Sequence, residues 1–486
     1  MCETQLWEVI TVVRYDLLVK NGTLVLPYVG TVCADLGVRD GRIAAIADDI
    51  PAAQADQVLD ARDRLVFPAA VDAHYHLGIY RDLALDAAEE TRSSLVGGVG
   101  TVLSYFRTGQ HYLNRTGPYA EIFPQVLDAV AGHAWTDYGF HLAPMDTAQV
   151  GEVPSLVDAH GVSSFKYYMF YKGFNLSADS RDAKSFTMSD EYDLGHLYQL
   201  MEAVAATRRE GRRVSLSLHC EQAELMRLFI DRVRAAGDPQ TLKAYSDARP
   251  PLTEQVAIGE ATTLARATGC PVNLLHLSSA AAIAAAAAAK ADRSLDLRCE
   301  VTLHHLCLDH ESLDRKGGLG AKVNPPIRAV SDTEALWAAV LDGTVDWVAS
   351  DHACCMEEHK GDALWPALPG FGGTALLYPI LLSEGMHKRG LSAQRVAELA
   401  SGNPARAYGL GGRKGSLMVG ADADLTIVDP ELEQEVTTDL LLSGQDHCPF
   451  EGHQVKGWPV TTVVGGRVAY TDGAVVGSPG GRYVVR

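Results

Sequence analysis

Residues 65–76 read Leu-Val-Phe-Pro-Ala-Ala-Val-Asp-Ala-His-Tyr-His, an apolar run that ends in two histidines separated by one residue. The apolar run predicts a buried strand, Leu65–His76. Side chains two residues apart on a strand point to the same face, so His74 and His76 are placed to bind one metal ion from one side. A lone His-x-His is more often ordinary strand sequence. The metal interpretation therefore depends on whether other strand ends supply further ligands.

Further candidate strands follow through the middle of the chain, and helical patterns separate many of them. They are Thr101–Tyr105, Asp137–Leu142, Ser163–Met169, Arg213–Cys220, Pro271–Ser279, Leu295–Leu306 and Val345–His352. The clearest helix is Ala280–Lys290, which is almost pure alanine and has Ser278 or Ser279 as a candidate N-cap. Strands that alternate with helices predict a parallel sheet, and eight of them predict an α/β fold of the (β/α)8 barrel type. In such a barrel the active site lies at the carboxyl ends of the strands.

Short apolar runs separated by turn signals occupy both ends of the chain. Asn21-Gly22 lies between two such runs, which is a typical hairpin signal. The last 70 residues or so show the same pattern of short apolar runs separated by turn signals. We therefore expect the two ends to pair into one β-sandwich domain, residues 1–66 and 410–486, and residues 67–409 to form the barrel.

Composition excludes several classes of protein. The chain has 486 residues and a formal net charge of −19, which argues against binding to nucleic acid. Its nine cysteines form no Cys-x-x-Cys pair, which is typical of reduced thiols in a reducing compartment. The N-terminus lacks the features of a signal peptide, and no apolar run reaches the ~20 residues of a membrane helix. We expect a cytoplasmic protein that does not bind membranes.

Side chains that bind metal ions recur at the predicted strand ends. Each has an ordinary alternative, because a strand histidine is commonly a hydrogen-bonded core residue and a lysine among aromatics commonly extends its tip to solvent. The whole set converges on one face of the barrel, which is harder to explain in that way. Histidine and carboxylate are the ligands that zinc prefers at catalytic sites. The set is His74, His76, Lys166, His219, His276 and Asp351.

Motifs spread over nearly the whole chain accompany these residues. They are 72–76 (Asp-Ala-His-Tyr-His), 164–172, 218–221 (Leu-His-Cys-Glu), 276–279, 324–328, 350–352 (Ser-Asp-His), 403–406, 420–424 and 449–452. Together they resemble the cyclic amidohydrolases, a family of dihydropyrimidinases, hydantoinases, allantoinases and dihydroorotases. The resemblance to dihydropyrimidinases and hydantoinases is the strongest.

The resemblance implies a barrel that holds two divalent metal ions, usually Zn²⁺, bridged by a lysine carboxylated by CO2. It assigns His74, His76 and Asp351 to one ion, His219 and His276 to the other, and carboxylated Lys166 to both. A free ammonium would repel the ions, whereas its CO2 adduct is an anion with two oxygens that can span paired ions (~3.5–4 Å apart). A lysine buried beside positive charge also loses its proton readily, which the adduct requires.

The same resemblance implies a mechanism, in which a hydroxide that bridges the metal ions opens a ring amide. Asp351 would accept the water proton and then deliver it to the leaving nitrogen. Tyr171 matches the family tyrosine that hydrogen-bonds the developing oxyanion, with a packed aromatic as its alternative. Asn324 would be a substrate contact. For His304 and His352, which lie near the site in sequence, we expect structural or indirect roles.

The substrate prediction rests on two motifs. Dihydroorotase-like enzymes carry an arginine for a substrate carboxylate at the position of Gly78, so its absence disfavours an acidic substrate. The pattern Lys-x-x-Met-x-Tyr-Lys at 166–172 resembles hydantoinases and dihydropyrimidinases most. We predict a neutral cyclic ureide or imide, such as a dihydropyrimidine or a 5-substituted hydantoin, that is opened to an N-carbamoyl amino acid.

Other interpretations remain open. The motifs at residues 302–306 and 322–328 resemble those of dihydroorotases and allantoinases more closely. An allantoinase-type or pathway-specific cyclic amide hydrolase therefore remains an alternative. A non-catalytic dihydropyrimidinase-like scaffold is disfavoured because all six ligand positions are retained, and a mononuclear deaminase would need no lysine. The resemblance also implies a homotetramer or homodimer. The polar segment Ser177–Asp193 is predicted to form a loop over the site.

Overall fold

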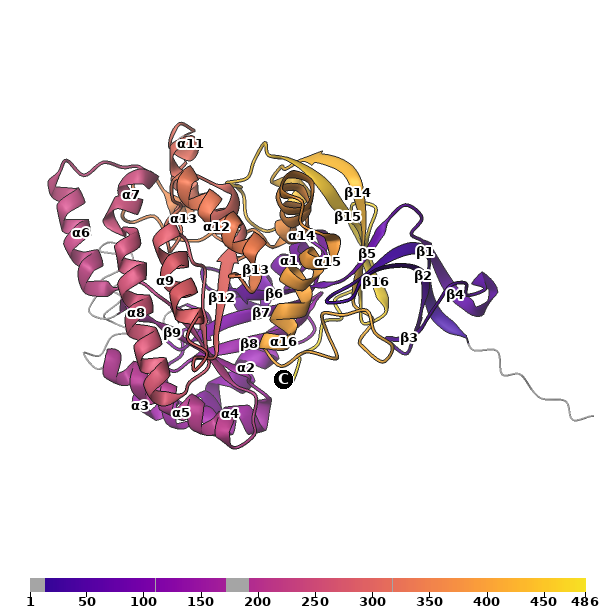
Figure 1. The fold of residues 1–486 in the computed structure, drawn as a ribbon, viewed down its shortest axis with the longest axis horizontal. Coiled ribbons are helices and arrows are strands. Elements are labelled where there is room, and N and C mark those ends of the chain that lie inside the picture. Colours follow the sequence, from indigo (N-terminus) through magenta and orange to yellow (C-terminus); the bar gives the residue numbers. More distant parts are fainter. Residues whose placement is uncertain (1–13, 110, 172–191, 317) are drawn as a thin grey trace, which may run out of the picture.

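The computed structural model describes residues 14–109, 111–171, 192–316 and 318–486 (Figure 1). Two sheets organise this part of the chain, one in the centre of the molecule and one formed by the chain ends. The predicted loop Ser177–Asp193 lies outside the described residues apart from its last two.

A parallel sheet forms the centre of the molecule. In the described ranges its eight strands are β6 (Ala70–Tyr75), β7 (Val99–Arg107), β8 (Asp137–Ala143), β9 (Ser164–Tyr168), β10 (Ser215–His219), β11 (Val272–Leu274), β12 (Leu297–Thr302) and β13 (Trp347–Ala349). Each strand pairs in parallel with the next along the chain. A bridge between Tyr75 and His352 joins the two edges, and the His76 amide donates to the His352 carbonyl at 2.8 Å. The prediction of an eight-stranded α/β barrel is confirmed.

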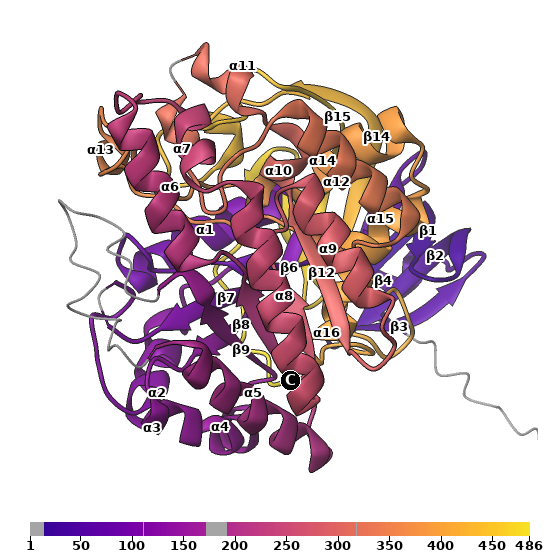
Figure 2. The same ribbon diagram turned by 60° about the vertical axis from the view of Figure 1, so that its left-hand side comes forward.

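Helices cover the outside of this barrel (Figures 1 and 2). They are α1 (Leu83–Val96), α2 (Tyr119–Val130), α3 (Thr147–Gly151), α4 (Val153–His160), α5 (Leu194–Arg209), α6 (Ala223–Ala235), α7 (Leu242–Ala248), α8 (Pro251–Thr268), α9 (Ala280–Lys290), α10 (Leu303–Cys307), α11 (His310–Asp314), α12 (Val330–Asp342), α13 (Glu357–Lys360), α14 (Leu377–Ile380), α15 (Ala393–Ala397) and α16 (Asn403–Ala407). Helix α9 has the bounds predicted from its alanines, and the Ser279 hydroxyl caps it by accepting from the Ala282 amide. Across the described ranges, no helix is both long and apolar enough to cross a membrane.

The predicted strand ends differ from the observed ones on the carboxyl side of the barrel. Strands β11, β12 and β13 stop earlier than predicted. After β11 and β13 the chain turns at His276 (φ 35°) and Asp351 (φ 51°), a left-handed backbone conformation that interrupts a regular strand. After β12 it continues directly as helix α10. The turns bring side chains of these segments over the mouth of the barrel.

The run Leu65–His76, predicted as one strand, is two strands that belong to different sheets. Its first part, β5 (Leu65–Pro68), pairs with strands of the terminal sheet, and only its second part, β6, enters the barrel. The chain passes between the sheets at Ala69, whose amide donates to the Asp424 carbonyl. Continuous apolarity predicts burial along the whole run and does not reveal the change of sheet.

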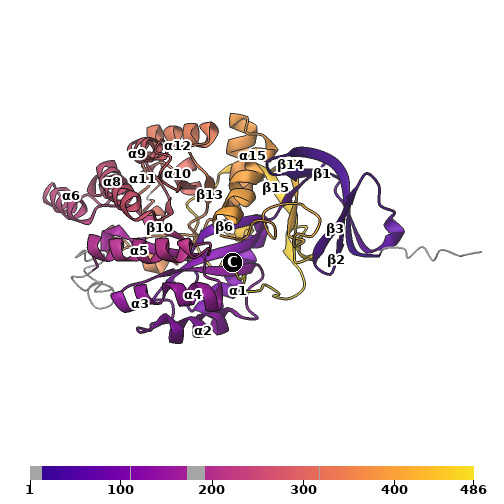
Figure 3. The ribbon, with the colours of Figure 1, turned by 60° about the horizontal axis from the view of Figure 1, so that its bottom comes forward.

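The two chain ends form one twisted sheet beside the barrel (Figure 3). Within the described residues its strands are β1 (Tyr15–Leu26), β2 (Gly30–Arg39), β3 (Arg42–Ala47), β4 (Ala55–Asp60), β5, β14 (Leu425–Glu435), β15 (Gln454–Val464), β16 (Arg467–Thr471) and β17 (Ala474–Val475). Strand β14 from the C-terminal part pairs with β5 from the N-terminal part. The prediction that the two ends build one β domain is confirmed, with hydrogen bonding continuous from β17 to β3.

Asn21-Gly22, interpreted as a hairpin turn, lies inside the single long strand β1. The pairing of β1 with β2 shifts register between Val19 and Gly22, and Asn21 has a left-handed backbone (φ 62°). The pair therefore forms a β-bulge, because asparagine before glycine suits any position that needs positive φ, whether or not the chain reverses there.

Candidate metal and active site

Three predicted ligands meet at the carboxyl end of the barrel, at strands that close it. Nε2 of His74 lies 3.0 Å and Nε2 of His76 lies 3.2 Å from the same oxygen, Oδ1 of Asp351. One ligand atom from each of the three residues lies within 4.8 Å of the other two. Two imidazoles and a carboxylate at this spacing are a donor set suited to a divalent cation.

The hydrogen bonds of His74 define which of its nitrogens faces the shared position. Nδ1 lies 2.6 Å from Oε1 of Glu300, and a carboxylate accepts only, so Nδ1 carries the proton. When the ring is neutral, Nε2 then has no proton and can only accept a hydrogen bond. It faces an oxygen of Asp351, which also can only accept. Two acceptors in contact require a cation or a proton between them. A divalent ion therefore fits the arrangement.

The titration of these groups agrees with that description. Burial lowers the pKa of His74, but the carboxylates of Asp351 and Glu300 outweigh it and raise the pKa to about 9. Burial lowers the pKa of His76 to about 4. Burial raises the pKa of Asp351, but His74 and His76 outweigh it and hold that pKa well below its usual value. Without a metal ion, one proton on His74 occupies the position that a cation would take.

The remaining three predicted ligands adjoin this group. The ring centroids of His219 and His276 are 4.3 Å apart, and that of His276 is 5.2 Å from His74. Nε2 of His219 lies 2.6 Å from Oε2 of Glu221, which leaves Nδ1 as its candidate ligand atom. Burial lowers the pKa of His219 to about 4 and that of His276 well below its usual value, so both rings are neutral ligands.

Lys166 is wholly buried, and its charge acts on His76, His219 and His276. Its Nζ has no hydrogen-bond partner among the described residues, and it lies 4.2 Å from the ring centroid of Tyr105 and 4.7 Å from that of Tyr168. Burial lowers the pKa of Lys166 to about 7, although Asp351 acts in the other direction. A buried polar group without a partner costs on the order of 1–3 kcal/mol of folding free energy. A covalent modification or a bound ligand that gives this amine a partner would remove that cost.

Two other groups of ligand-type side chains are each built around a basic residue. Nη1 of Arg81 lies 3.2 Å from Oε1 of Glu90 and 3.2 Å from Sγ of Cys354. Nζ of Lys414 lies 2.6 Å from Oδ2 of Asp137. Each group already holds a cation from the chain itself, unlike the group at the barrel mouth. The two groups are Asp86, Glu90 and Cys354, and Asp137, Asp422 and Asp424.

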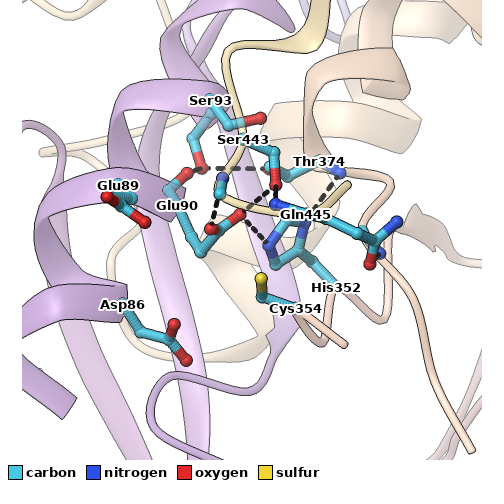
Figure 4. Close-up of polar contacts among 12 residues, drawn as sticks. Asp86, Glu89, Glu90, Ser93, His352, Cys354, Thr374, Ser443 and Gln445 are labelled. Atoms are coloured by element: carbon cyan, nitrogen blue, oxygen red, sulfur yellow. Dashed lines mark hydrogen bonds and ion pairs between the residues drawn. The ribbon is translucent and has the colours of Figure 1, made fainter. Parts of the chain in front are cut away.

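The backbone of Asp351 is held from both sides. Its positive φ costs on the order of 1–3 kcal/mol for a residue other than glycine. On one side the Ser350 hydroxyl donates to Asp72 at 2.5 Å. On the other side Nε2 of His352 lies 2.9 Å from Oε2 of Glu90 (Figure 4). These buried hydrogen bonds hold the two residues that flank Asp351 in the chain.

The two predicted substrate contacts, Tyr171 and Asn324, lie in different surroundings. Tyr171 is buried in a short helix (Met169–Tyr171) directly after β9, with its ring stacked on Tyr168 at 4.5 Å and the Arg107 guanidinium 5.7 Å from its centroid. Oδ1 of Asn324 accepts from the Tyr245 hydroxyl and from Arg249. A substrate contact by the side chain of Asn324 would therefore come from its Nδ2.

Supporting residues that the sequence did not reveal surround the ligands. Glu300 also accepts from the Trp347 indole at 2.8 Å, which fixes its position behind His74. Arg249 donates to Glu221, which in turn holds His219. The available signals are two charged residues in strand β12, Arg298 and Glu300, and a glutamate two residues after His219. Arg249 has no local signal.

Replacing Glu300 with glutamine is expected to weaken zinc binding about 10–100-fold, the usual effect of losing a partner that orients a metal-binding histidine. The amide retains the size of the side chain, but it has one acceptor oxygen where the carboxylate has two, and its NH2 group only donates. It therefore cannot accept from both His74 and Trp347. Competition with a chromophoric chelator measures the affinity. The matched control is Glu358→Gln, since the Glu358 side chain is 80% exposed. Equal zinc affinity in both variants would contradict the role of Glu300.

Comparisons with known proteins agree over almost the full chain. The sequence pattern of the amidohydrolase family matches residues 65–469. An allantoinase of Rubrobacter xylanophilus is 32% identical over 97% of this chain and 97% of its own length, and a D-hydantoinase of Ralstonia pickettii is 28% identical over 96% and 97%. A solved structure of D-hydantoinase has a TM-score of 0.86 at 27% identity, covering 97% of this chain and 99% of that one. The L-hydantoinase (dihydropyrimidinase) structure from Arthrobacter aurescens has a TM-score of 0.85 at 27% identity, covering 97% and 100%. These matches confirm the resemblance inferred from the motifs: the chain belongs to the amidohydrolase family.

Proposed function

We propose that this protein is a metal-dependent hydrolase that opens the ring amide of a neutral cyclic ureide or imide. The dihydropyrimidines and 5-substituted hydantoins are the candidate substrates, and an N-carbamoyl amino acid is the product. The observation that carries the proposal is Lys166, a buried amine without a hydrogen-bond partner in the described part of the chain. Its charge acts on His76, His219 and His276, and the charge of Asp351 acts on it. The family membership of the chain and the names of its relatives support the same class of reaction.

The proposed cofactor is a pair of divalent ions, with zinc favoured by the histidine-rich donor set. His74, His76 and Asp351 would hold one ion, His219 and His276 the other, and carboxylated Lys166 both. With its pKa near 7, Lys166 has a large neutral fraction near neutral pH, and the neutral amine is the form that adds to CO2 and then loses a proton. Bound ions would supply a Lewis acid for the ring carbonyl and a water that ionises near neutral pH.

The protein's own side chains then have separate tasks. Asp351 accepts the proton of the attacking water, and the water oxygen bonds to the carbonyl carbon. The same carboxyl group delivers that proton to the ring nitrogen as the carbon–nitrogen bond breaks. Tyr171 donates its phenolic hydrogen to the oxygen on which negative charge develops. Its position directly after β9 brings it to the same end of the barrel as Lys166.

Allantoin is the second candidate substrate, because the allantoinase of Rubrobacter xylanophilus is 32% identical to this chain. Allantoin is a hydantoin with a ureido group at C5, so it belongs to the same chemical class. We also propose a homotetramer or homodimer, in line with the family, which light scattering of the purified protein tests.

A substrate panel tests the proposed function. The zinc-loaded enzyme is assayed for ring opening of dihydrouracil, hydantoin, 5-substituted hydantoins, allantoin and dihydroorotate. We expect turnover of at least one neutral ureide and much slower turnover of the anionic dihydroorotate. The proposal would be contradicted if none of the neutral rings were hydrolysed.

Replacing Tyr171 with phenylalanine is expected to lower kcat about 10²–10³-fold, the usual loss when one oxyanion donor is removed. KM should change little, because the bond forms fully only when charge develops on the oxygen. Steady-state kinetics on the best substrate measure both constants. Tyr198→Phe is the control, because Tyr198 lies exposed on α5. A kcat equal to that of the control would show that Tyr171 is a packed aromatic only.

A further inference from the structure

A chain of hydrogen bonds at the end of β12 determines the protonation of His304. Nε2 of His305 lies 3.1 Å from the Pro325 carbonyl, which only accepts, so Nε2 of His305 carries the ring proton. Burial lowers the pKa of His305 well below its usual value, so the ring is neutral and its Nδ1 is an acceptor. That Nδ1 lies 2.7 Å from the Thr302 hydroxyl, which must therefore donate to it.

Thr302 has a single hydroxyl proton, and His305 takes it. Oγ1 of Thr302 is also 2.9 Å from Nε2 of His304, and with its proton used it can only accept there. Nε2 of His304 is therefore protonated. Burial lowers the pKa of His304 to about 4, so the ring is neutral and its Nδ1 is a bare lone pair. In the described part of the chain that Nδ1 has no hydrogen-bond partner, although His304 is 1% exposed.

This lone pair belongs to a ring at the mouth of the barrel. His304 lies in the first turn of α10, directly after the carboxyl end of β12. The charges that act on it most are those of Asp351 and His74, two of the candidate metal ligands. Phe371 packs edge-on against the ring at 5.1 Å and holds its orientation. A buried acceptor left without a donor is destabilising, and a bound ligand with an N–H group would remove that cost.

We infer that Nδ1 of His304 binds the substrate by accepting a hydrogen bond from a ring N–H. The inference rests on the proposed function and narrows its substrate class to rings with a free N–H next to a carbonyl. Cyclic ureides and imides carry such groups. A ring methylated at that nitrogen has no donor and would bury a methyl group against the lone pair. His304 therefore has a direct role in binding, in place of the structural role that its sequence context suggested.

Two substitutions separate the two nitrogens of the ring. In His304→Gln the amide reaches the position of Nε2 and can still bond to Thr302, but the acceptor at Nδ1 is gone. In His304→Asn the amide oxygen takes the position of Nδ1 and the bond to Thr302 is lost. The zinc-loaded enzymes are compared on dihydrouracil and on its two N-methyl isomers, by kcat/KM.

The expected result is a coupling between the residue and one ring nitrogen. Wild type should discriminate against one N-methyl isomer by about 10–100-fold, the usual effect of an unmade hydrogen bond plus a misplaced methyl group. His304→Gln should reduce that factor to a few-fold, and His304→Asn should keep more of it. Discrimination that is the same in all three enzymes for both isomers would overturn the inference.

A second measurement does not depend on turnover and so separates this inference from the proposed function. ¹⁵N NMR of histidine-labelled, zinc-loaded enzyme reports the tautomer of His304, assigned by comparison with His304→Gln. We expect Nε2–H with an unprotonated Nδ1, and a shift of the Nδ1 resonance when succinimide is added but not with N-methylsuccinimide. A proton on Nδ1, or equal shifts with both imides, would overturn the inference even if ring opening is observed. If no ring is opened but the NMR result is as expected, the failure lies with the proposed reaction.

Discussion

Replacing Lys166 with methionine is expected to abolish ring opening almost completely, with kcat/KM lower by on the order of 10⁴-fold, or about 5.5 kcal/mol. The reason is the loss of the carboxylated amine, the only candidate bridge between the two halves of the ligand set among the described residues. Methionine has a similar size and no charge, so the packing against Tyr105 and Tyr168 is retained. Kinetics of zinc-loaded protein measure the effect.

The same variant is expected to fold at least as well as wild type. Lys166 is wholly buried and its Nζ lacks a hydrogen bond in the described structure, so its removal relieves a desolvation penalty. The unfolding temperature of the metal-free variant should equal or exceed that of metal-free wild type. Lys243→Met, at a side chain that is 58% exposed, is the control for charge removal.

Full activity and full metal content in Lys166→Met would contradict the bridging role of Lys166 and favour a mononuclear enzyme.

Replacing Asp351 with asparagine is expected to lower kcat about 10²–10⁴-fold, the range for loss of a general acid–base group. An amide cannot take the water proton, and it presents no negative charge to the histidines. Zinc affinity should fall as well, because Asp351 shares its Oδ1 with His74 and His76. Kinetics and chelator competition on the same sample separate the two effects at saturating zinc.

The control for Asp351→Asn is Asp231→Asn, an exposed position on α6. Both variants replace an aspartate with asparagine, but only Asp351 lies at the mouth of the barrel. If Asp351→Asn retains wild-type activity and zinc content, Asp351 is neither the acid–base group nor a metal ligand, and this part of the proposed mechanism is wrong.

The candidate ligands were predictable because each carries a local signal. His74 and His76 share a face through the two-residue period of a strand, and Asp351 follows a short apolar run. The positions of the barrel strands were predictable because short apolar runs alternate with helical patterns along this part of the chain. The spatial grouping of the ligands follows from the fold class, since parallel strands bring their carboxyl ends to one side.

The supporting residues depend on contacts that sequence alone does not contain. Glu300 binds a histidine 226 positions away, and nothing near Glu300 in the chain points to that partner. The bare lone pair of His304 follows from three successive hydrogen bonds, each of which determines the next. Asn21-Gly22 shows the converse limit, because its conformational preference was predicted correctly and its place in a strand was not.

The assembled centre can be tested directly in crystals of the protein saturated with zinc and bicarbonate. Anomalous scattering at the zinc edge is expected to show two ions at the barrel mouth, one beside His74 and one beside His219, with a carboxylated Lys166 between them. A single ion, or none, beside an unmodified Lys166 under these conditions would contradict the account.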